Sequence, residues 1–188
     1  MSTGILSSYL LRLWKTGHLK KSGWIPGPYI TRPERKFPRN ISLRSANFQS
    51  GYQNDRQLSF GLVDMAWHSV TSPVNGSIQA FENQAMAPTE SFPPVDSSCF
   101  STGFGHIFGG GYAAGYYSYK WAEVLDADAF SVFKQQGIYD QATAESFRKN
   151  ILEKGGSEHP MILYKRFRGQ EPTIDALLER SGLKSKSE

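Results

Sequence analysis

Cysteine, histidine and long apolar runs are scarce in this chain of 188 residues, and these shortages exclude several classes of protein. Cys99 is the single cysteine, so no intrachain disulfide can form and a reducing compartment is permitted. No stretch approaches the roughly 20 apolar residues of a membrane-spanning helix. The apolar patch at residues 5–14 has no basic segment before it and no small-residue cleavage site. We therefore expect no signal peptide, no membrane partner and a cytoplasmic location.

The net charge of +4 is distributed unevenly along the chain. Residues 1–44 hold nine of the 21 Lys and Arg residues but one of the 17 acidic residues, Glu34. The rest of the chain therefore carries 12 basic against 16 acidic residues, a mildly acidic balance. Because the positive charge is confined to the N-terminal segment, we expect no nucleic-acid partner.

Neither convincing apolar–polar alternation nor an internal repeat is present, so the sequence predicts an all-α fold. Apolar periodicity and Gly or Pro boundaries predict helices at residues 45–70, 77–86, 113–136, 140–153, 157–167 and 172–181. The composition of residues 88–102, rich in Pro, Ser and Thr, is typical of a loop. We expect Gly137 to close the third helix, Ser157 to cap the fifth, and Pro172 to lie in the first turn of the sixth.

The most informative stretch is residues 104–119, FGHIFGGGYAAGYYSY, in which a histidine precedes a glycine run and several tyrosines follow it. The run Gly109, Gly110 and Gly111 permits positive φ and predicts a flexible hinge that can approach a ligand closely. Tyr112, Tyr116 and Tyr119 recur at i, i+4 and i+7, a spacing that aligns three phenols on one face of a helix.

A second face of the same expected helix is predicted to be its core stripe. That face carries Tyr117, Trp121, Val124 and Leu125, whereas the tyrosine face continues to Glu123 and is expected to be wetter. Structural interpretations stay open beside the functional one. A tyrosine stripe can be buried structure, and His106 can be a neutral core histidine.

Three other sequence patterns are weaker candidates for a functional site. The G-x-G-x-x-x-G pattern at residues 103–109 lacks the preceding strand that a dinucleotide-binding loop requires. His68 has no acidic or cysteine partner at ligand spacing, so we interpret it as structural. Asp126 and Asp128 lie two residues apart on the long helix, and a solvated helix surface explains them.

The stretch at residues 104–119 closely resembles the C-terminal signature of the thimet oligopeptidase, oligopeptidase A and dipeptidyl carboxypeptidase family of zinc metallopeptidases. The resemblance extends over residues 45–183 and includes ANFQSGY at residues 46–52, WAEVL at 121–125, GGSE at 155–158, RFRG at 166–169, EP at 171–172 and GL at 182–183. In this family an H-E-x-x-H helix and a further Glu hold the metal. No such motif exists in this chain.

The resemblance implies roles for individual residues. Tyr119 matches the residue that donates a hydrogen bond to the oxyanion formed when zinc-activated water attacks the peptide carbonyl. A phenol stays protonated at neutral pH and so can donate. His106, Tyr112 and Tyr116 match positions that line or contact bound peptide, as does the glycine run Gly109, Gly110 and Gly111.

Residues 1–44 do not resemble the family, and two hypotheses for this basic head are open. If the reading frame is displaced by one nucleotide, the codons of residues 29–34 can encode H-Y-E-T-G. The same displacement forces an acidic residue at the codons that begin with Trp14 and with Trp24. The resulting sequence motifs match those that the family shows before its ANFQSGY segment. The head is therefore interpreted either as an out-of-frame translation or as a genuine basic arm, with residues 184–188 forming a short tail.

We expect the chain to be the C-terminal part of a catalytic domain that hydrolyses short peptides as an oligopeptidase or peptidyl-dipeptidase. The intact family enzyme uses zinc, but we expect no zinc bound by this chain and no activity from it alone. Its expected partners are short peptides and the missing N-terminal half of the peptidase. The competing hypothesis is a non-catalytic peptide-binding or interaction module.

Overall fold

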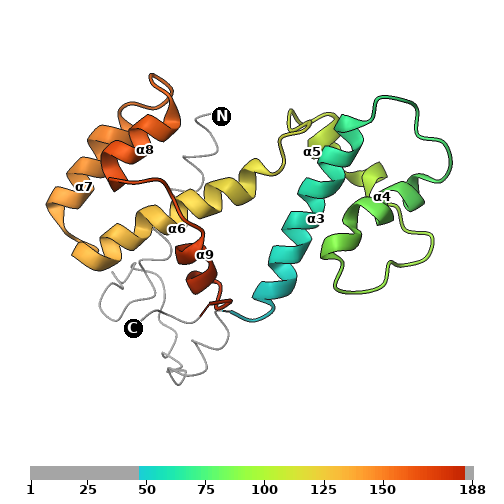
Figure 1. The fold of residues 1–188 in the computed structure, drawn as a ribbon, viewed down its shortest axis with the longest axis horizontal. Coiled ribbons are helices and arrows are strands. Elements are labelled where there is room, and N and C mark those ends of the chain that lie inside the picture. The colour runs from blue at the N-terminus through green and yellow to red at the C-terminus, as the bar shows by residue number, and fades with distance from the viewer. Residues whose placement is uncertain (1–46, 185–188) are drawn as a thin grey trace, which may run out of the picture. The chain divides into compact units, whose positions relative to one another are not determined.

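The computed structural model describes residues 47–184, so the expected head at residues 1–44 and most of the 184–188 tail lie outside the described residues. Within 47–184 the fold is entirely helical and contains no strand, as the sequence predicts (Figure 1). The chain divides into two compact units. Among the described residues, unit 2 is Gln49–Trp121, and unit 1 combines residues 47–48 with residues 122–184.

Unit 2 is organised around the long helix α3 (Ser50–Ser69), which packs against α4 (Ile78–Met86). The helix predicted at residues 45–70 is confirmed, but it begins at Ser50 because Gln49 has a left-handed backbone, with φ of 55°. Ser77 caps α4 by accepting a hydrogen bond from the Ala80 N–H at 3.4 Å. Two 3₁₀ turns (Ala87–Thr89 and Ser101–Gly103) and the short α5 (Gly105–Phe108) follow.

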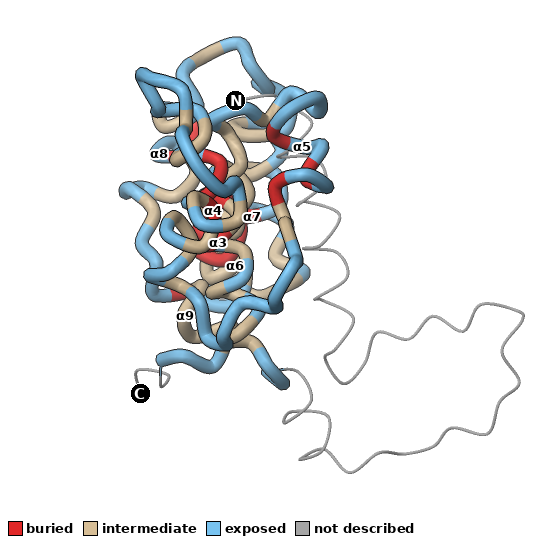
Figure 2. Tube along the Cα trace, turned by 90° about the vertical axis from the view of Figure 1, so that its right-hand side faces the viewer, coloured by how far each residue is buried: buried red, intermediate tan, exposed pale blue. Residues whose placement is uncertain are grey.

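The core of unit 2 is small and aromatic. Val63 on α3 is fully buried and packs with Phe104, which precedes α5, and with Ile107 within α5. Figure 2 shows the buried segments in red. The rings of Phe60 and Phe100 stack against this core with centroids 4.6 Å apart. These contacts hold α5 and the segment after it against α3.

Unit 1 contains four α-helices among its described residues. They are α6 (Ser118–Gln136), whose first turn belongs to unit 2, then α7 (Gln141–Phe147), α8 (Pro160–Arg168) and α9 (Asp175–Arg180). A π-helical turn (Arg148–Leu152) extends α7, which matches the helix predicted at residues 140–153. The rings of Phe133, Phe147 and Phe167 pack together in this unit.

The predicted helix ends of unit 1 are partly right. Gly137 closes α6 as expected, with φ of 119° and its N–H bonded to the Phe133 carbonyl at 2.9 Å. The cap of α8 is His159, whose Nδ1 accepts the Met161 N–H at 3.3 Å, so the prediction that Ser157 caps this helix is wrong. Helix α9 begins at Asp175, which leaves Pro172 outside its first turn.

Asp126 and Asp128 are buried, so their interpretation as a solvated surface is wrong. Asp128 is 2% exposed, and it accepts hydrogen bonds from the Tyr164 hydroxyl at 2.6 Å and from Arg168 Nε at 2.9 Å. Asp126 pairs with Arg180 at 2.5 Å. Two residues apart on α6, the two carboxylates reach α8 and α9 separately, which ties three helices of unit 1 together.

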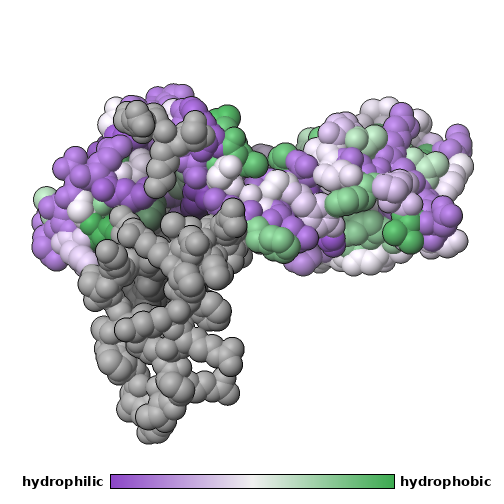
Figure 3. Space-filling view, turned by 90° about the horizontal axis from the view of Figure 1, so that it is seen from below, coloured by the Kyte–Doolittle hydropathy of each residue, from purple (hydrophilic) through white to green (hydrophobic). Residues whose placement is uncertain are grey.

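Apolar side chains remain exposed on unit 2. Leu58, Leu62 and Met65 lie at i, i+4 and i+7 on α3 and are 45%, 39% and 43% exposed. The space-filling view shows green apolar surface interrupting the polar surface of the molecule (Figure 3). No helix among the described residues is both long and apolar enough to cross a membrane.

Candidate functional site

The three tyrosines predicted to share a helix face lie on two kinds of structure. Helix α6 begins at Ser118, so Tyr119 is helical but Tyr112 and Tyr116 belong to the turns before it. Hydrogen bonds in these turns span three residues, from the Gly115 N–H to the Tyr112 carbonyl at 2.8 Å and from the Tyr119 N–H to the Tyr116 carbonyl at 3.1 Å. Ala114 is left-handed, with φ of 50°, which a helix does not allow. The prediction of one continuous helix from residue 113 is therefore wrong.

The same tyrosine rings nevertheless lie together. Tyr112 stacks on Tyr119 with ring centroids 5.1 Å apart, and Tyr116 lies 5.0 Å from Tyr119. The exposed His106 ring lies 6.1 Å from Tyr112 and 6.4 Å from Tyr116. We call His106, Tyr112, Tyr116 and Tyr119 the tyrosine cluster. Folding of the turns thus gathers the four ring-bearing residues that the sequence singles out.

Tyr116 of the cluster packs against the core of unit 2. Its ring packs against Phe60 and Phe104 of the unit 2 core, and its hydroxyl donates to Gln57 Oε1 at 3.2 Å. Burial raises the pKa of this phenol, and the charge of Arg56 opposes that rise without cancelling it. Tyr116 therefore remains a neutral hydrogen-bond donor at physiological pH.

The glycine run folds back on α5. The N–H groups of Gly109 and Gly110 both donate to the Gly105 carbonyl at 2.8 Å, and the Tyr112 N–H donates to the His106 carbonyl at 3.2 Å. A Cβ on Gly110 would lie 2.9 Å from the His106 backbone, too close for any side chain without movement. Gly111 has φ of 80°. Glycine is thus required at positions 110 and 111 to bring the cluster's histidine and tyrosines together.

Tyr117 does not lie on a core face. It precedes α6 and is 55% exposed, so its placement in a core stripe with Trp121, Val124 and Leu125 is wrong. Val124, in contrast, is buried as predicted. The error follows from the turns at residues 112–117, which break the helical spacing used to assign the two faces.

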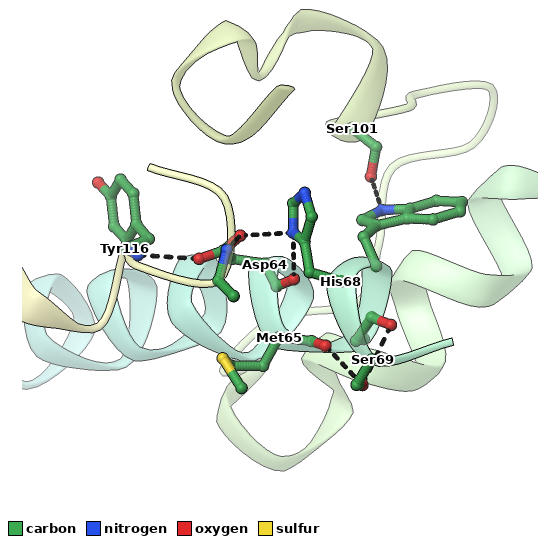
Figure 4. Close-up of polar contacts among 9 residues, drawn as sticks. Asp64, Met65, His68, Ser69, Ser101 and Tyr116 are labelled. Atoms are coloured by element: carbon green, nitrogen blue, oxygen red, sulfur yellow. Dashed lines mark hydrogen bonds and ion pairs between the residues drawn. The ribbon is translucent and has the colours of Figure 1, made fainter. Parts of the chain in front are cut away.

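Asp64 on α3 is the residue of this site that the sequence interpretation missed. It is fully buried, and its two carboxylate oxygens accept the Ala114 N–H at 2.9 Å and the Tyr116 N–H at 2.8 Å (Figure 4). His68 Nδ1 lies 2.8 Å from both the carboxylate and the backbone carbonyl of Asp64. The expectation that His68 has no acidic partner is therefore wrong. The i, i+4 spacing of Asp64 and His68 was the signal available in the sequence.

The described residues do not fit a zinc ion. Among residues 47–184 no group of three or more His, Cys, Asp or Glu side chains is arranged to hold a metal. A catalytic zinc site takes three protein ligands and keeps one open position. The chemistry that the tyrosine cluster can supply is hydrogen-bond donation from phenols and ring contact with a bound chain.

The all-helical structure agrees with the resemblance to a segment of a metallopeptidase catalytic domain that the sequence indicates. Residues 37–183 match Peptidase family M3, and residues 37–44 of that match fall within the expected N-terminal head. The chain therefore belongs to Peptidase family M3, a family of zinc metallopeptidases.

Named relatives agree with this assignment. Oligopeptidase A of Escherichia coli (strain K12) is 45% identical over 168 residues, which cover 86% of this chain and 24% of that protein. Probable cytosolic oligopeptidase A of Arabidopsis thaliana is 40% identical, over 81% of this chain and 22% of that protein. Dipeptidyl carboxypeptidase of Salmonella typhimurium is 39% identical, over 79% and 22% respectively. The chain thus spans about a quarter of the length of these relatives.

Proposed function

We propose that this chain is the C-terminal, substrate-side part of a zinc-dependent peptidase that hydrolyses short peptides. The observation that carries the proposal is the tyrosine cluster, in which three phenols and one exposed imidazole meet beside a tightly folded glycine run. Phenols at such a site offer neutral donors to a carbonyl oxygen that becomes negative during the reaction. Identity of 38% to 45% to peptidases of two names supports the same class of chemistry.

Within this proposal each residue of the cluster has a distinct role. Tyr119 is the catalytic residue of the chain, because it donates a hydrogen bond to the oxyanion of the scissile peptide. His106, Tyr112 and Tyr116 bind the peptide and hold it in register. Gly109, Gly110 and Gly111 form a hinge that lets His106 approach and leave the peptide backbone.

The metal half of the site would come from the N-terminal half of the peptidase. The described residues do not fit zinc, and the chain spans about a quarter of its relatives' length. We propose that an N-terminal partner carrying the H-E-x-x-H helix completes the enzyme, and that this chain alone does not hydrolyse peptides. The exposed apolar stripe of Leu58, Leu62 and Met65 supports such a partner. A cytoplasmic location is part of the same proposal.

A chimera tests the function directly. Residues 45–183 of this chain replace the matching quarter of Escherichia coli oligopeptidase A, and hydrolysis of short peptides is followed by mass spectrometry. We expect cleavage that depends on Tyr119 and on zinc. The positions of the cuts decide between internal cleavage and release of C-terminal dipeptides. A folded chimera that binds peptide without cleaving it would favour the non-catalytic peptide-binding module instead.

The N-terminal head has its own test. We propose that residues 1–36, the part of the head that precedes the family match, arise from an out-of-frame translation, and the DNA sequence around the codon of Phe37 decides this. If the gene has gained or lost a single nucleotide there, correcting it would restore the family's sequence motifs upstream and support the out-of-frame hypothesis. An intact reading frame would instead favour a genuine basic arm.

A further inference from the structure

The tyrosine cluster is attached to the rest of unit 2 through one carboxylate. Asp64 lies in the C-terminal half of α3, is 0% exposed, and accepts hydrogen bonds from two backbone N–H groups and one ring N–H. Two of these donors, the backbone amides of Ala114 and Tyr116, come from residues 50 and 52 positions further along the chain. Both amides precede α6, so no helical carbonyl of that element is available to them.

The chemistry of this carboxylate favours a fixed geometry. A buried carboxylate is costly unless its oxygens are hydrogen-bonded, and here one oxygen takes each amide. Both atoms facing His68 Nδ1 are acceptors, the Asp64 carboxylate and the Asp64 carbonyl, so Nδ1 must carry the proton. Hydrogen bonds to a charged acceptor are shorter and stronger than neutral ones.

The turn that Asp64 holds contains a strained backbone position. Ala114 has φ of 50°, a left-handed conformation that residues other than glycine adopt reluctantly. Along the chain, Tyr112 precedes the two anchored amides and Tyr119 follows them. The rings of these two tyrosines stack with their centroids 5.1 Å apart. The carboxylate therefore fixes the part of the backbone that sets the distance between the two phenols.

We propose that Asp64 is a positioning residue for the three tyrosines of the cluster. It sets their relative placement by accepting hydrogen bonds from the Ala114 and Tyr116 amides. The importance of Asp64 for catalysis rests on the proposed function. Its role in placing the three tyrosine rings is independent of that function. The competing explanation is that Asp64 only adds stability to unit 2. A matched control separates the two.

Glu82 supplies that control. It is 3% exposed, lies on α4 of the same unit, and accepts two successive backbone amides, those of Phe100 and Ser101, each at 2.8 Å. The bond type and number are therefore the same, but the anchored segment carries no tyrosine of the cluster. Tyr112 and Tyr119 are the reporters, because their stacked pair lies on the segment that Asp64 anchors.

The experiment uses the full chain with ¹³C-labelled tyrosine rings and compares Asp64→Asn with Glu82→Gln. An Asn side chain keeps one acceptor oxygen and turns an NH₂ group toward the second amide, so one of the two anchors is lost. We expect the ring signals of Tyr112 and Tyr119 to shift or broaden in Asp64→Asn. Amide exchange at Ala114 and Tyr116 should accelerate at least tenfold. In Glu82→Gln the two ring signals should stay in place, although both variants melt at lower temperature. Unmoved ring signals in Asp64→Asn, or equal movement in Glu82→Gln, would overturn the proposal.

A measurement on the unsubstituted chain keeps the proposal testable if Asp64→Asn does not fold. The amide protons of Ala114 and Tyr116 should resonate downfield and exchange slowly, as expected for donors to a buried carboxylate. Rapid exchange of both amides would refute the anchoring.

The oligopeptidase A chimera then separates this inference from the proposed function. With Asp64→Asn we expect kcat to fall at least tenfold with a smaller change in KM, and with Glu82→Gln no such split. A chimera that is inactive without any substitution would refute the proposed function, while the ring signals of the free chain would still decide the role of Asp64.

Discussion

The ring of Tyr112 stacks on the ring of Tyr119 at an interplanar angle of 26°, although the two residues belong to different structural elements. Tyr119 is fixed by α6, whereas Tyr112 is fixed by a turn that bonds back to α5. One phenol of the pair is therefore held by regular helix and the other by loop geometry.

Removing the Tyr119 hydroxyl should slow catalysis in the oligopeptidase A chimera. If this phenol donates to the oxyanion only as charge develops, Tyr119→Phe should lower kcat by roughly 10-fold to 1,000-fold with KM nearly unchanged. Tyr117→Phe is the matched control, because Tyr117 is 55% exposed and lies outside the cluster. Steady-state kinetics on one short peptide would check both. Loss of kcat in Tyr117→Phe alone would mean that the two tyrosines have been assigned the wrong roles.

Two glycine-to-alanine changes should act in opposite directions on stability. Gly110→Ala places a Cβ 2.9 Å from the His106 backbone and should cost roughly 1–3 kcal/mol. Gly61→Ala places one in ordinary contact, 3.7 Å from the Tyr117 Cα, within α3. Because glycine weakens a helix interior, this change should stabilise by about 0.5–1 kcal/mol. Urea unfolding of both variants measures the difference, and an unchanged midpoint for Gly110→Ala would contradict the close approach.

Acid should loosen the segment that Glu82 anchors. Burial by itself would raise the pKa of this carboxyl, but hydrogen bonds from Ser101, Phe100 and Cys99 outweigh burial and hold it below its ordinary value of 4.5. A lowered folded-state pKa means that the stabilisation is present above about pH 4.5 and is lost as pH falls through the lowered pKa. The difference in melting temperature between the unsubstituted chain and Glu82→Gln should therefore shrink below pH 4.5. A difference that grows on acidification would have the wrong sign.

The isolated chain should not retain zinc. None of the described residues form a group of three potential ligands, and the single cysteine is Cys99, whose thiol contacts Glu82 at 3.6 Å. Dialysis against a weak chelator followed by elemental analysis should leave far less than one zinc per chain. Stoichiometric zinc after dialysis would show that residues outside the described range complete a site.

The apolar stripe on α3 should cause association. Leu58, Leu62 and Met65 present adjoining apolar surface, so the chain should form dimers or larger species and melt with poor cooperativity. Leu62→Lys should shift the distribution toward monomer in light scattering, whereas Ile162→Lys in unit 1, where Ile162 is 50% exposed, should not. A monodisperse monomer with a sharp transition would argue against an interface on this face.

The sequence predicted the helices well where local signals decide them. Periodicity located α4, and Gly137 located the end of α6, because each signal depends on neighbours within one or two helical turns. The same reasoning failed at residues 112–117. There the backbone follows hydrogen bonds to Asp64, whose partners lie 50 and 52 residues away and leave no local pattern.

The sequence therefore predicted that the three tyrosines lie together, but it predicted neither the geometry that brings them together nor the part played by Asp64, and the functional roles of these residues stay predictions. The resemblance to the family selected His106, Tyr112, Tyr116 and Tyr119, and their rings do meet. Helical spacing gave the wrong reason for that meeting. A buried aspartate at an interior position of α3 looked like an ordinary polar residue, since burial is a property of the packed fold.

Asp64 sits on an entirely regular stretch of helix, yet it dictates the shape of an irregular one. In protein design, active-site loops are hard to build because their backbones lack ladders of their own. This arrangement suggests a simple design. One aspartate can face inward from a regular helix, with a histidine one turn later to orient it. Such an aspartate can hold a non-helical turn in place while the helix itself stays regular.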